Sequence, residues 1–357
     1  MKQKRLLLIY QNYATFVRED DRILSSHFKV SRYRHRSSKN PFRFILEMAK
    51  LKLYCLFNIY RFDIIYIWFA DYHSFIPSLF GKIAGKKVVI VVGGYDAVSV
   101  PSINFGVFLK KNFRAFCARR SYKLADLILP VDESLVEGLN TYADPSGNGY
   151  PIGIRHFVKR LKGNIQVVPT GYDDQKWRRH KNIDRKKAVI TIGGAPTTQT
   201  FRRKGLDLYL DTAAIMPDIS FYLVGLQGKM EEMAKTRSTP NVHFMGYLPN
   251  DELPAILSSC KVFAQFSMSE GLPNTLCEAM LCECIPVGSD VNGIPKGIGD
   301  CGFILDEKNA EKAKALIFRA LDADDELGRK ARKHIREHFH QTYRSSKLIQ
   351  LIDSLKP

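Results

Sequence analysis

Several signals that would assign the chain to other protein classes are missing from its 357 residues. No run approaches the roughly 18 consecutive apolar residues of a membrane-spanning helix. The apolar run Leu6–Tyr10, after the basic start Lys2–Arg5, is too short for a signal peptide, so we expect no leader. Neither half carries Gly-x-Gly-x-x-Gly after its first strand-like run, which disfavours a nicotinamide-dependent dehydrogenase.

The cysteines indicate neither a metal site nor a disulfide framework. There are seven, an odd number, and they are scattered. Cys282 and Cys284 are two apart, but no His or Cys partner has zinc-like spacing, so we expect no metal and assign both to packing. A reducing cytoplasm agrees with this cysteine usage. No zinc finger or aromatic platform motif is recognisable either, so we expect no nucleic acid partner.

Acidic residues are scarce in the first half of the chain. Residues 1–170 carry 27 Lys and Arg against 12 Asp and Glu, a net charge of +15, whereas residues 171–357 carry 27 against 24, a net charge of +3. Such an excess attracts nucleic acid, acidic substrates or anionic lipid. Cations alternate with bulky apolar residues in Asn40–Arg61, which predicts a helix that is apolar over most of its circumference, and in Phe105–Lys123.

Two readings of these basic and apolar segments stay open. A helix that lies in a lipid headgroup layer has this composition, because apolar burial adds to its attraction for anionic lipid. A buried crossover helix whose long basic side chains reach the surface has it as well. The two segments together with the net charge favour an anionic membrane surface, so we expect a cytoplasmic protein that is peripheral on the inner face of the cell membrane.

Short apolar runs alternate with segments long enough for helical crossovers in both halves. This alternation is typical of parallel sheets covered on both faces, and it predicts an α/β protein with two doubly wound, Rossmann-like domains that face a central cleft. The predicted strands are Arg5–Tyr10, Asp63–Phe69, Lys87–Val92, Leu127–Val131 and Ile165–Pro169 in the first half, and Ala188–Ile192, Ser220–Val224, Val242–Met245, Val262–Phe266, Ile285–Gly288 and Gly302–Leu305 in the second.

The segment Ser269–Met280 has the strongest chemical signature, because Glu270 and Glu278 bracket a turn that opens a helix. Gly271 and Pro273 break the chain after an apolar run, and the helix is predicted to begin at or near the next residue. Free amides at a helix start attract phosphate, while carboxylates accept hydrogen bonds from sugar and ribose hydroxyls. Taken alone, two such glutamates are more often a solvated helix face.

The order of segments between Asn241 and Leu305 resembles the donor-binding half of family 4 glycosyltransferases. It runs through Asn241–Pro249, a helical stretch, a strand, the two-glutamate turn, Cys284–Asp290 and Gly293-Ile294-Pro295, with echoes upstream in Val167–Asp173 and Arg203-Lys204-Gly205. The resemblance implies the two-Rossmann (GT-B) architecture. It places an acceptor-binding domain at 1–170, a nucleotide-sugar-binding domain at 171–334 and a C-terminal helix at 335–357 that crosses back to the first domain.

The resemblance also implies an activity, namely the retaining, metal-independent transfer of a sugar from a nucleoside diphosphate donor to an acceptor hydroxyl. The acceptor would be a lipid-linked or cell-surface glycan precursor at the membrane, and no cofactor besides the donor is implied. Lys204 would hold the donor diphosphate, Glu270 the donor sugar and Glu278 the ribose hydroxyls. Backbone groups would contact the base at Gly246, Tyr247 and Leu248, and the sugar and phosphate at Gly271, Leu272, Pro273, Asn274 and Thr275.

The chain departs from the family pattern at two positions that matter for turnover. The family arginine six residues before Lys204 is Thr198 here, and we expect Arg202 or Arg203 to supply the missing cation. The family's cleft histidine corresponds to Gly93 in Gly93-Gly94-Tyr95-Asp96, where Asp96 would bind a sugar hydroxyl or stay a structural turn residue.

These departures keep alternative functions open. One is a nucleotide-sugar-binding protein that has lost turnover, and the other is an epimerase or phosphorylase of the same architecture.

Overall fold

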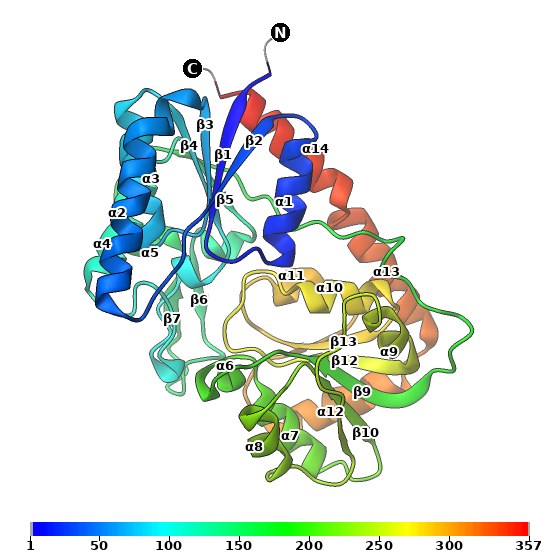
Figure 1. Cartoon of the computed structure of the whole chain (residues 1–357). Helices are drawn as coiled ribbons and strands as arrows, with labels where there is room; N and C mark the ends of the chain where they lie inside the picture. Colours follow the sequence, from blue (N-terminus) through cyan, green and yellow to red (C-terminus); the bar gives the residue numbers. More distant parts are fainter. Residues whose placement is uncertain (1–2, 356–357) are drawn as a thin grey trace.

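The computed structural model describes residues 3–355, which form two α/β domains on either side of a cleft (Figure 1). Each domain holds a six-stranded parallel sheet with helices on both faces. The α/β class and the two doubly wound sheets predicted from the short apolar runs are confirmed. The core strands are apolar on both faces, as burial beneath two helical layers requires, and Leu6 to Ile9 are fully enclosed.

The first sheet has the strand order β2-β1-β3-β4-β5-β8. Helices α2, α3 and α4 cover one of its faces, and α1 lies on the other beside the last helix of the chain (Figure 1). The strands of this domain are β1 (Arg5–Tyr10), β2 (Lys29–Arg34), β3 (Ile64–Trp68), β4 (Lys87–Val92), β5 (Leu127–Pro130) and β8 (Asn164–Ile165), with a hairpin of β6 (Gly138–Asn140) and β7 (Tyr150–Ile152). The helices are α1 (Thr15–Ser25), α2 (Pro41–Asn58), α3 (Tyr72–Ile83), α4 (Phe113–Leu124) and α5 (Ile154–Phe157).

The second sheet has the strand order β11-β10-β9-β12-β13-β14. Its strands are β9 (Lys186–Ile192), β10 (Ser220–Val224), β11 (Val242–Phe244), β12 (Cys260–Gln265), β13 (Ile285–Ser289) and β14 (Phe303–Leu305). The helices are α6 (Thr198–Arg203), α7 (Leu206–Ala214), α8 (Lys229–Lys235), α9 (Leu253–Ser259), α10 (Asn274–Leu281), α11 (Ile294–Ile298), α12 (Ala310–Asp322), α13 (Asp325–His338) and α14 (Gln341–Asp353).

The structure corrects three sequence expectations. Strand β2 was not predicted; it lies at the edge of the sheet, and its alternating cations leave no continuous apolar run. The run Ile165–Pro169 forms a strand only at its start, in β8. The C-terminal segment 335–357 does not continue as one helix, because α13 ends at His338 and α14 begins at Gln341.

The return of α14 to the first domain depends on a buried ion pair. Arg344 donates hydrogen bonds through Nε and Nη2 to the Asp20 carboxylate of α1 at 2.6 and 2.8 Å. Its Nη1 donates to the carbonyl oxygens of Val168 at 2.8 Å and Pro169 at 2.9 Å, in the segment that leaves the first domain. Both charged residues are almost fully enclosed, so one guanidinium fixes α1, α14 and the connecting segment together.

We expect Arg344→Ala to lower the free energy of unfolding by about 3–5 kcal/mol, because it leaves the Asp20 carboxylate buried without its partner. Urea unfolding measures this loss. Arg329→Ala is the matched control, since this arginine and its partner Glu326 are both exposed and its loss should cost about 1 kcal/mol or less. Equal losses in the two variants would contradict the assignment.

Candidate functional site in the cleft

Two adjoining cavities occupy the cleft between the domains. The larger, here called the Glu278 cavity, has a volume of about 980 Å³, and the smaller, here called the Glu270 cavity, has about 510 Å³. Phe16, Thr170 and Asn274 line both of them. The carboxyl ends of parallel strands point toward this cleft, where open α/β sheets bind their ligands.

The predicted turn and helix start lie between the two cavities. β12 leads through Glu270 and Gly271 into α10, which begins at Asn274 with Pro273 at the N-cap position. Because this cap supplies no side-chain hydrogen bond, the first-turn amides keep their donors available. Gly271, Leu272, Pro273, Asn274 and Thr275 all line the Glu270 cavity, so the structure brings these five predicted residues together.

A cluster of opposite charges surrounds Glu270. Its carboxylate lies 2.9 Å from Lys204 Nζ and 3.1 Å from Arg203 Nη1. Burial opposes its ionisation, but the charges of Lys204 and Arg203 outweigh burial and lower the pKa of Glu270 to about 2. The glutamate is therefore an anion at neutral pH, and the two cations converge on the start of α10.

Only one of the two candidate arginines takes part in this cluster. Arg203 lines the Glu270 cavity, donates to the Ser269 carbonyl oxygen at 2.9 Å and lies 5.1 Å over the Phe105 ring of the first domain. Arg202 is exposed and lines neither cavity, and the same holds for Thr198 at the start of α6. Of the two arginines, Arg203 is thus the one that lies in the Glu270 cavity.

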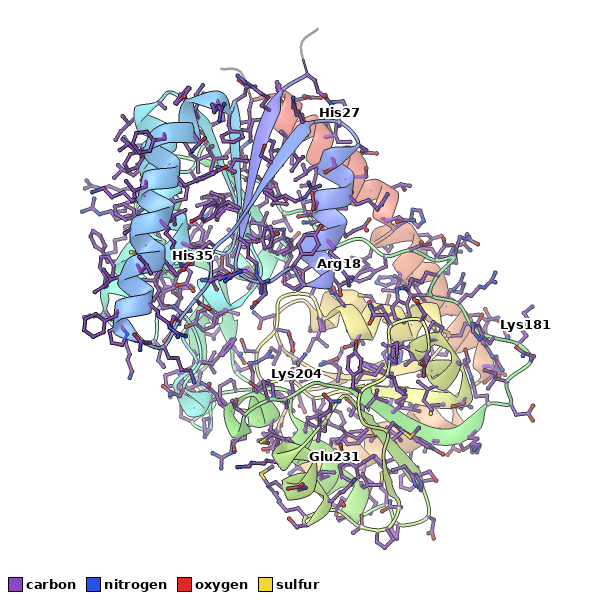
Figure 2. The ribbon with its side chains drawn as sticks, in the orientation of Figure 1. Arg18, His27, His35, Lys181, Lys204 and Glu231 are labelled. Carbon is purple, nitrogen blue, oxygen red and sulfur yellow. The ribbon has the colours of Figure 1, made fainter. Side chains whose placement is uncertain are left out.

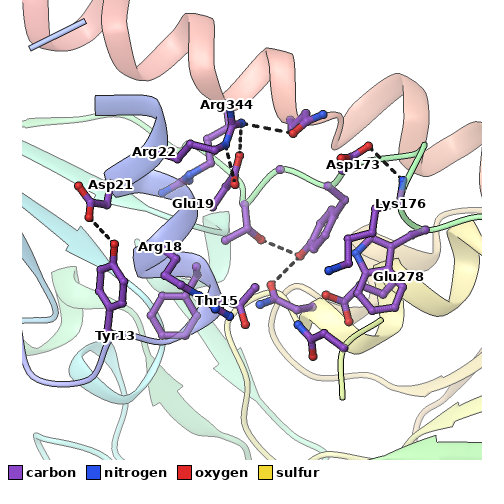
Figure 3. A pocket seen from close by; sticks show the side chains of 18 of the residues that line it. Tyr13, Thr15, Arg18, Glu19, Asp21, Arg22, Asp173, Lys176, Glu278 and Arg344 are labelled. Carbon is purple, nitrogen blue, oxygen red and sulfur yellow. Dashed lines mark hydrogen bonds and ion pairs between the residues drawn. The ribbon is translucent and has the colours of Figure 1, made fainter. Parts of the chain in front are cut away.

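Glu278 lines the larger cavity from inside α10 (Figure 3). Its side chain is 6% exposed, and its carboxyl has no hydrogen-bond partner among residues 3–355. Burial raises the pKa of Glu278 to about 8, and Lys176 opposes this rise only weakly. Its acceptor and donor capacity is therefore available to a ligand that enters the cavity.

The first domain contributes a cation that the sequence analysis missed. Arg18 projects from α1 into the Glu278 cavity (Figure 3), and Lys204 lies across the cleft in the other domain (Figure 2). It forms no ion pair with the described part of the chain, whereas its neighbour Arg22 pairs with Glu19. A single arginine on an amphipathic helix carries no local motif, so only its position beside the cavity identifies it.

Of the two readings of Asp96, the structure agrees with the structural turn residue and not with the sugar ligand. This carboxylate is fully buried beneath the cleft and accepts hydrogen bonds from Ala70 N at 2.9 Å and Tyr122 Oη at 2.8 Å. It also accepts from Gly93 N at 3.1 Å and Gly94 N at 3.2 Å, so its oxygens are occupied by the protein. Asp96 shapes the glycine turn and cannot reach a sugar hydroxyl.

The two glycines of that turn serve the contact between the domains. A Cβ on Gly271 would lie 2.4 Å from the carbonyl oxygen of Gly93, and one on Gly94 would lie 3.2 Å from Gly271 N. Gly94 also has a φ of 134°, a backbone conformation that disfavours a side chain. The missing family histidine therefore leaves backbone, rather than an imidazole, facing the two-glutamate turn.

The segment Gly246–Leu248 is not brought to either cavity. The Gly246 carbonyl oxygen accepts from Gly225 N at 2.6 Å, and Tyr247 is 65% exposed. Asn250, two residues later, lines the Glu278 cavity in its place, together with Lys176 and Trp177. The residue after this segment that lines a cavity, Asn250, was not among those the sequence pattern singled out.

No group of three or more potential metal ligands occurs among the described residues. The second half does contain an Asp-x-Asp sequence, Asp322-Ala323-Asp324, at the junction of α12 and α13. Asp322 pairs with Lys187 at 3.1 Å, and Asp324 caps α13 through the amide of Glu326. Neither aspartate lines a cleft cavity, so this sequence serves the helix junction.

Comparison with known proteins agrees with this geometry. Residues 173–338 match the family described as Glycosyl transferases group 1. O-antigen chain mannosyltransferase B from Escherichia coli is 30% identical over 83 residues, which are 23% of this chain and 22% of the relative. The putative teichuronic acid biosynthesis glycosyltransferase TuaC from Bacillus subtilis is 24% identical over 255 residues, 71% of this chain and 59% of the relative. The chain thus matches less than two thirds of the length of either relative.

Solved structures share the architecture over nearly the whole chain. Anabaena HepE covers 99% of this chain and 100% of its own, with a TM-score of 0.71 at 13% identity. Sucrose-phosphate synthase from Thermosynechococcus elongatus covers 98% of both chains, with a TM-score of 0.74 at 15% identity. The chain therefore has the GT-B fold, and nearly all of its second domain matches the model of the glycosyl transferases group 1 family.

Proposed function

We propose that the chain is a retaining, metal-independent glycosyltransferase that moves a sugar from a nucleoside diphosphate donor to an acceptor hydroxyl. The observation that carries this proposal is the convergence of Lys204 and Arg203 on Glu270 beside the uncapped start of α10. Two cations and free helix-start amides form an electropositive corner that suits a diphosphate. A structure of the fold relative HepE contains UDP and glucose, which supports a donor of this class.

The donor diphosphate would compete with Glu270 for the two cations. When the bond between the anomeric carbon and the phosphate oxygen breaks, negative charge grows on the diphosphate, and Lys204, Arg203 and the α10 amides stabilise it more than they stabilise the bound donor. The acceptor oxygen bonds to the anomeric carbon on the same face, and its proton passes to the leaving phosphate oxygen. No protein nucleophile is required, and the anomeric configuration is retained.

The two glutamates would divide the rest of the donor between the cavities. Glu270, ionised at neutral pH, accepts hydrogen bonds from the donor sugar in the smaller cavity. Glu278 contacts the ribose in the larger cavity, where Asn250, Lys176 and Trp177 offer polar and aromatic contacts to a base. Arg18 then faces the ligand from the first domain and supplies a further cation when the donor is in place.

The acceptor in this proposal is a lipid-linked or cell-surface glycan precursor, and the enzyme works on the cytoplasmic face of the membrane. Names of relatives support an acceptor of this kind, since one acts on a diphospho-undecaprenol glycan and another is a subunit that acts on phosphatidylinositol. The net charge of +15 over residues 1–170 supports attraction to an anionic lipid surface.

A nucleotide-sugar-binding protein without turnover is the second candidate. It is favoured by Gly93 in place of the family histidine and by the enclosure of Asp96, which together leave no carboxyl or imidazole group of the first domain in the Glu270 cavity. Incubation with labelled donor and membrane extract separates the candidates. Binding without any labelled product would overturn the proposed transfer.

A donor-binding assay tests the electropositive corner. A nucleoside diphosphate present at 100 times its dissociation constant should stabilise the wild-type protein by about 2.7 kcal/mol in thermal unfolding. We expect Arg203→Ala and Lys204→Ala each to weaken binding by about one to two orders of magnitude, the value of a charge-assisted hydrogen bond. Arg202→Ala is the matched control and should change affinity by about twofold at most. Equal effects at positions 202 and 203 would refute the assignment.

Glu278→Gln should stabilise the ligand-free protein at pH 8 but not at pH 5. The Glu278 carboxyl, with a pKa of about 8 when folded against a usual 4.5, keeps its proton in the folded state while the unfolded chain releases it. The free energy of unfolding of the wild-type protein therefore falls as pH rises from 4.5 to 8, by on the order of 3 kcal/mol. Glutamine does not titrate, so the variant does not lose this stability. Urea unfolding at both pH values measures the difference, with exposed Glu337→Gln as the control. A gain that is equal at the two pH values would rule out the buried titration.

A further inference from the structure

Helix α2 turns an apolar stripe toward solvent. Phe42, Ile45 and Phe57 are 84%, 64% and 63% exposed, although each is a large apolar side chain. At about 100° per residue, the exposed apolar positions fall within a sector of about 120° of the helix surface. These positions are Phe42, Ile45, Leu46, Leu53, Leu56 and Phe57, and Tyr60 continues them in the turn that follows.

This stripe faces solvent because the opposite side of α2 packs against the first domain. Leu51 and Cys55 are fully buried against the first domain, and Asn40 caps the helix start. Rotating the stripe inward would expose that packed face, so the helix has two apolar faces and the fold can bury only one. Contiguous apolar surface of this kind is rare on soluble proteins unless it serves an interaction.

Cations border the stripe on both sides. Arg43, Lys50 and Arg61 lie along one edge and Lys52 along the other, all exposed. Arg43, Lys52 and Arg61 have no ion pair with residues 3–355, and the single acidic residue of α2, Glu47, pairs with Lys50. The surface therefore combines unpaired positive charge with bulky apolar side chains.

The same composition continues from the start of α2 across α3 to α4. Phe44 of α2 contacts Tyr72 of α3 with ring centroids 4.9 Å apart, and Tyr72 contacts Phe113 of α4 at 5.9 Å. Phe113 and Phe116 are 56% and 41% exposed. The exposed cations Lys110, Lys111 and Arg120 lie beside them, with the Arg120 guanidinium 5.2 Å over the Phe116 ring.

We propose that the apolar stripe of α2, with Phe113 and Phe116 of α4, docks on an anionic lipid bilayer and lies in its headgroup layer. The net charge favours a bilayer over a second copy of this chain as the partner. Two copies would bring together two domains of net charge +15, whereas acidic headgroups complement the cations. A helix in this position buries its apolar face among acyl chains and keeps its flanking cations at the phosphates. No helix among the described residues has the length and hydropathy to cross the bilayer, so docking is peripheral.

This surface deepens the proposed function, on which its biological role rests, because it leads to the cleft. The Arg114 guanidinium lies 5.5 Å over the Tyr72 ring at the edge of the surface and 4.8 Å over the Tyr95 ring. Tyr95 lines the Glu270 cavity. An acceptor anchored in the same bilayer would therefore reach the cavity along the start of α2 and α4.

Flotation with vesicles tests the docking surface. The wild-type protein should float with mixed phosphatidylcholine and phosphatidylglycerol vesicles at low salt and not with phosphatidylcholine alone. We expect Phe42→Ser with Phe57→Ser to reduce partitioning more than tenfold, and Lys52→Gln with Arg61→Gln to reduce it about fivefold for each lost cation. Phe318→Ser, at a 41% exposed position of the second domain, is the matched control and should partition as wild type.

Tryptophan fluorescence tests the same surface by detecting binding directly, rather than by its loss in a variant. Phe57→Trp should add an emission that shifts to shorter wavelength on anionic vesicles, while Phe318→Trp should show no such shift; the two native tryptophans are buried. Absence of wild-type flotation at low salt, or equal flotation of the serine variant, would overturn the proposal. So would a dimer in size-exclusion chromatography that becomes a monomer in the serine variant.

Donor binding separates this proposal from the proposed function. The serine variant should keep the thermal stabilisation by a nucleoside diphosphate, because none of its changes touches the cleft. Vesicle binding without any donor stabilisation in the wild type would instead refute the proposed function and leave the docking surface intact.

Discussion

The buried pair between Arg344 and Asp20 is the constraint on which the cleft depends. Asp20 also accepts hydrogen bonds from Tyr66 Oη at 2.7 Å and Trp68 Nε1 at 2.9 Å, so it is fixed from the sheet as well as from α14. The same guanidinium binds the carbonyl oxygens that lead out of the first domain. α1, which carries Arg18, is therefore fixed to α14 and to the connecting segment by a contact that lies outside the site itself.

Inside the cleft of the ligand-free protein, the cations Lys204 and Arg203 are neutralised by the carboxylate of Glu270. Lys204 and Arg203 are attracted to Glu270, whose low pKa measures how strongly the two cations favour its ionised form. Glu278, about one turn inside α10, is buried without such partners, and its pKa rises. Two carboxyls eight residues apart thus acquire opposite properties from their surroundings, and the proposed diphosphate site lies between them.

The local part of this arrangement is predictable from sequence, and the tertiary part is not. Glycine, proline and apolar runs locate β12, the turn and the start of α10, because those signals act over neighbouring residues. Asp96 was assigned to the ligand because nothing near it in sequence shows that Tyr122 and Ala70 would occupy its oxygens. Arg18 and Asn250 were missed for the same reason, since each becomes part of the site only through the packing of whole elements.

The sequence pattern of α2 is compatible with two different environments of the helix. Its apolar residues surround most of the helix, which left a buried crossover and a lipid-facing helix as alternatives. The structure shows a buried apolar face and an exposed apolar face on opposite sides of the helix. The start of α2 follows strand β2, so it lies at the carboxyl edge of the sheet, the edge at which the cleft opens. A helix parallel to the bilayer at that edge brings the cleft close to the headgroups. In the proposed reaction, a lipid-linked acceptor would enter the cleft from that side and meet the donor near Lys204.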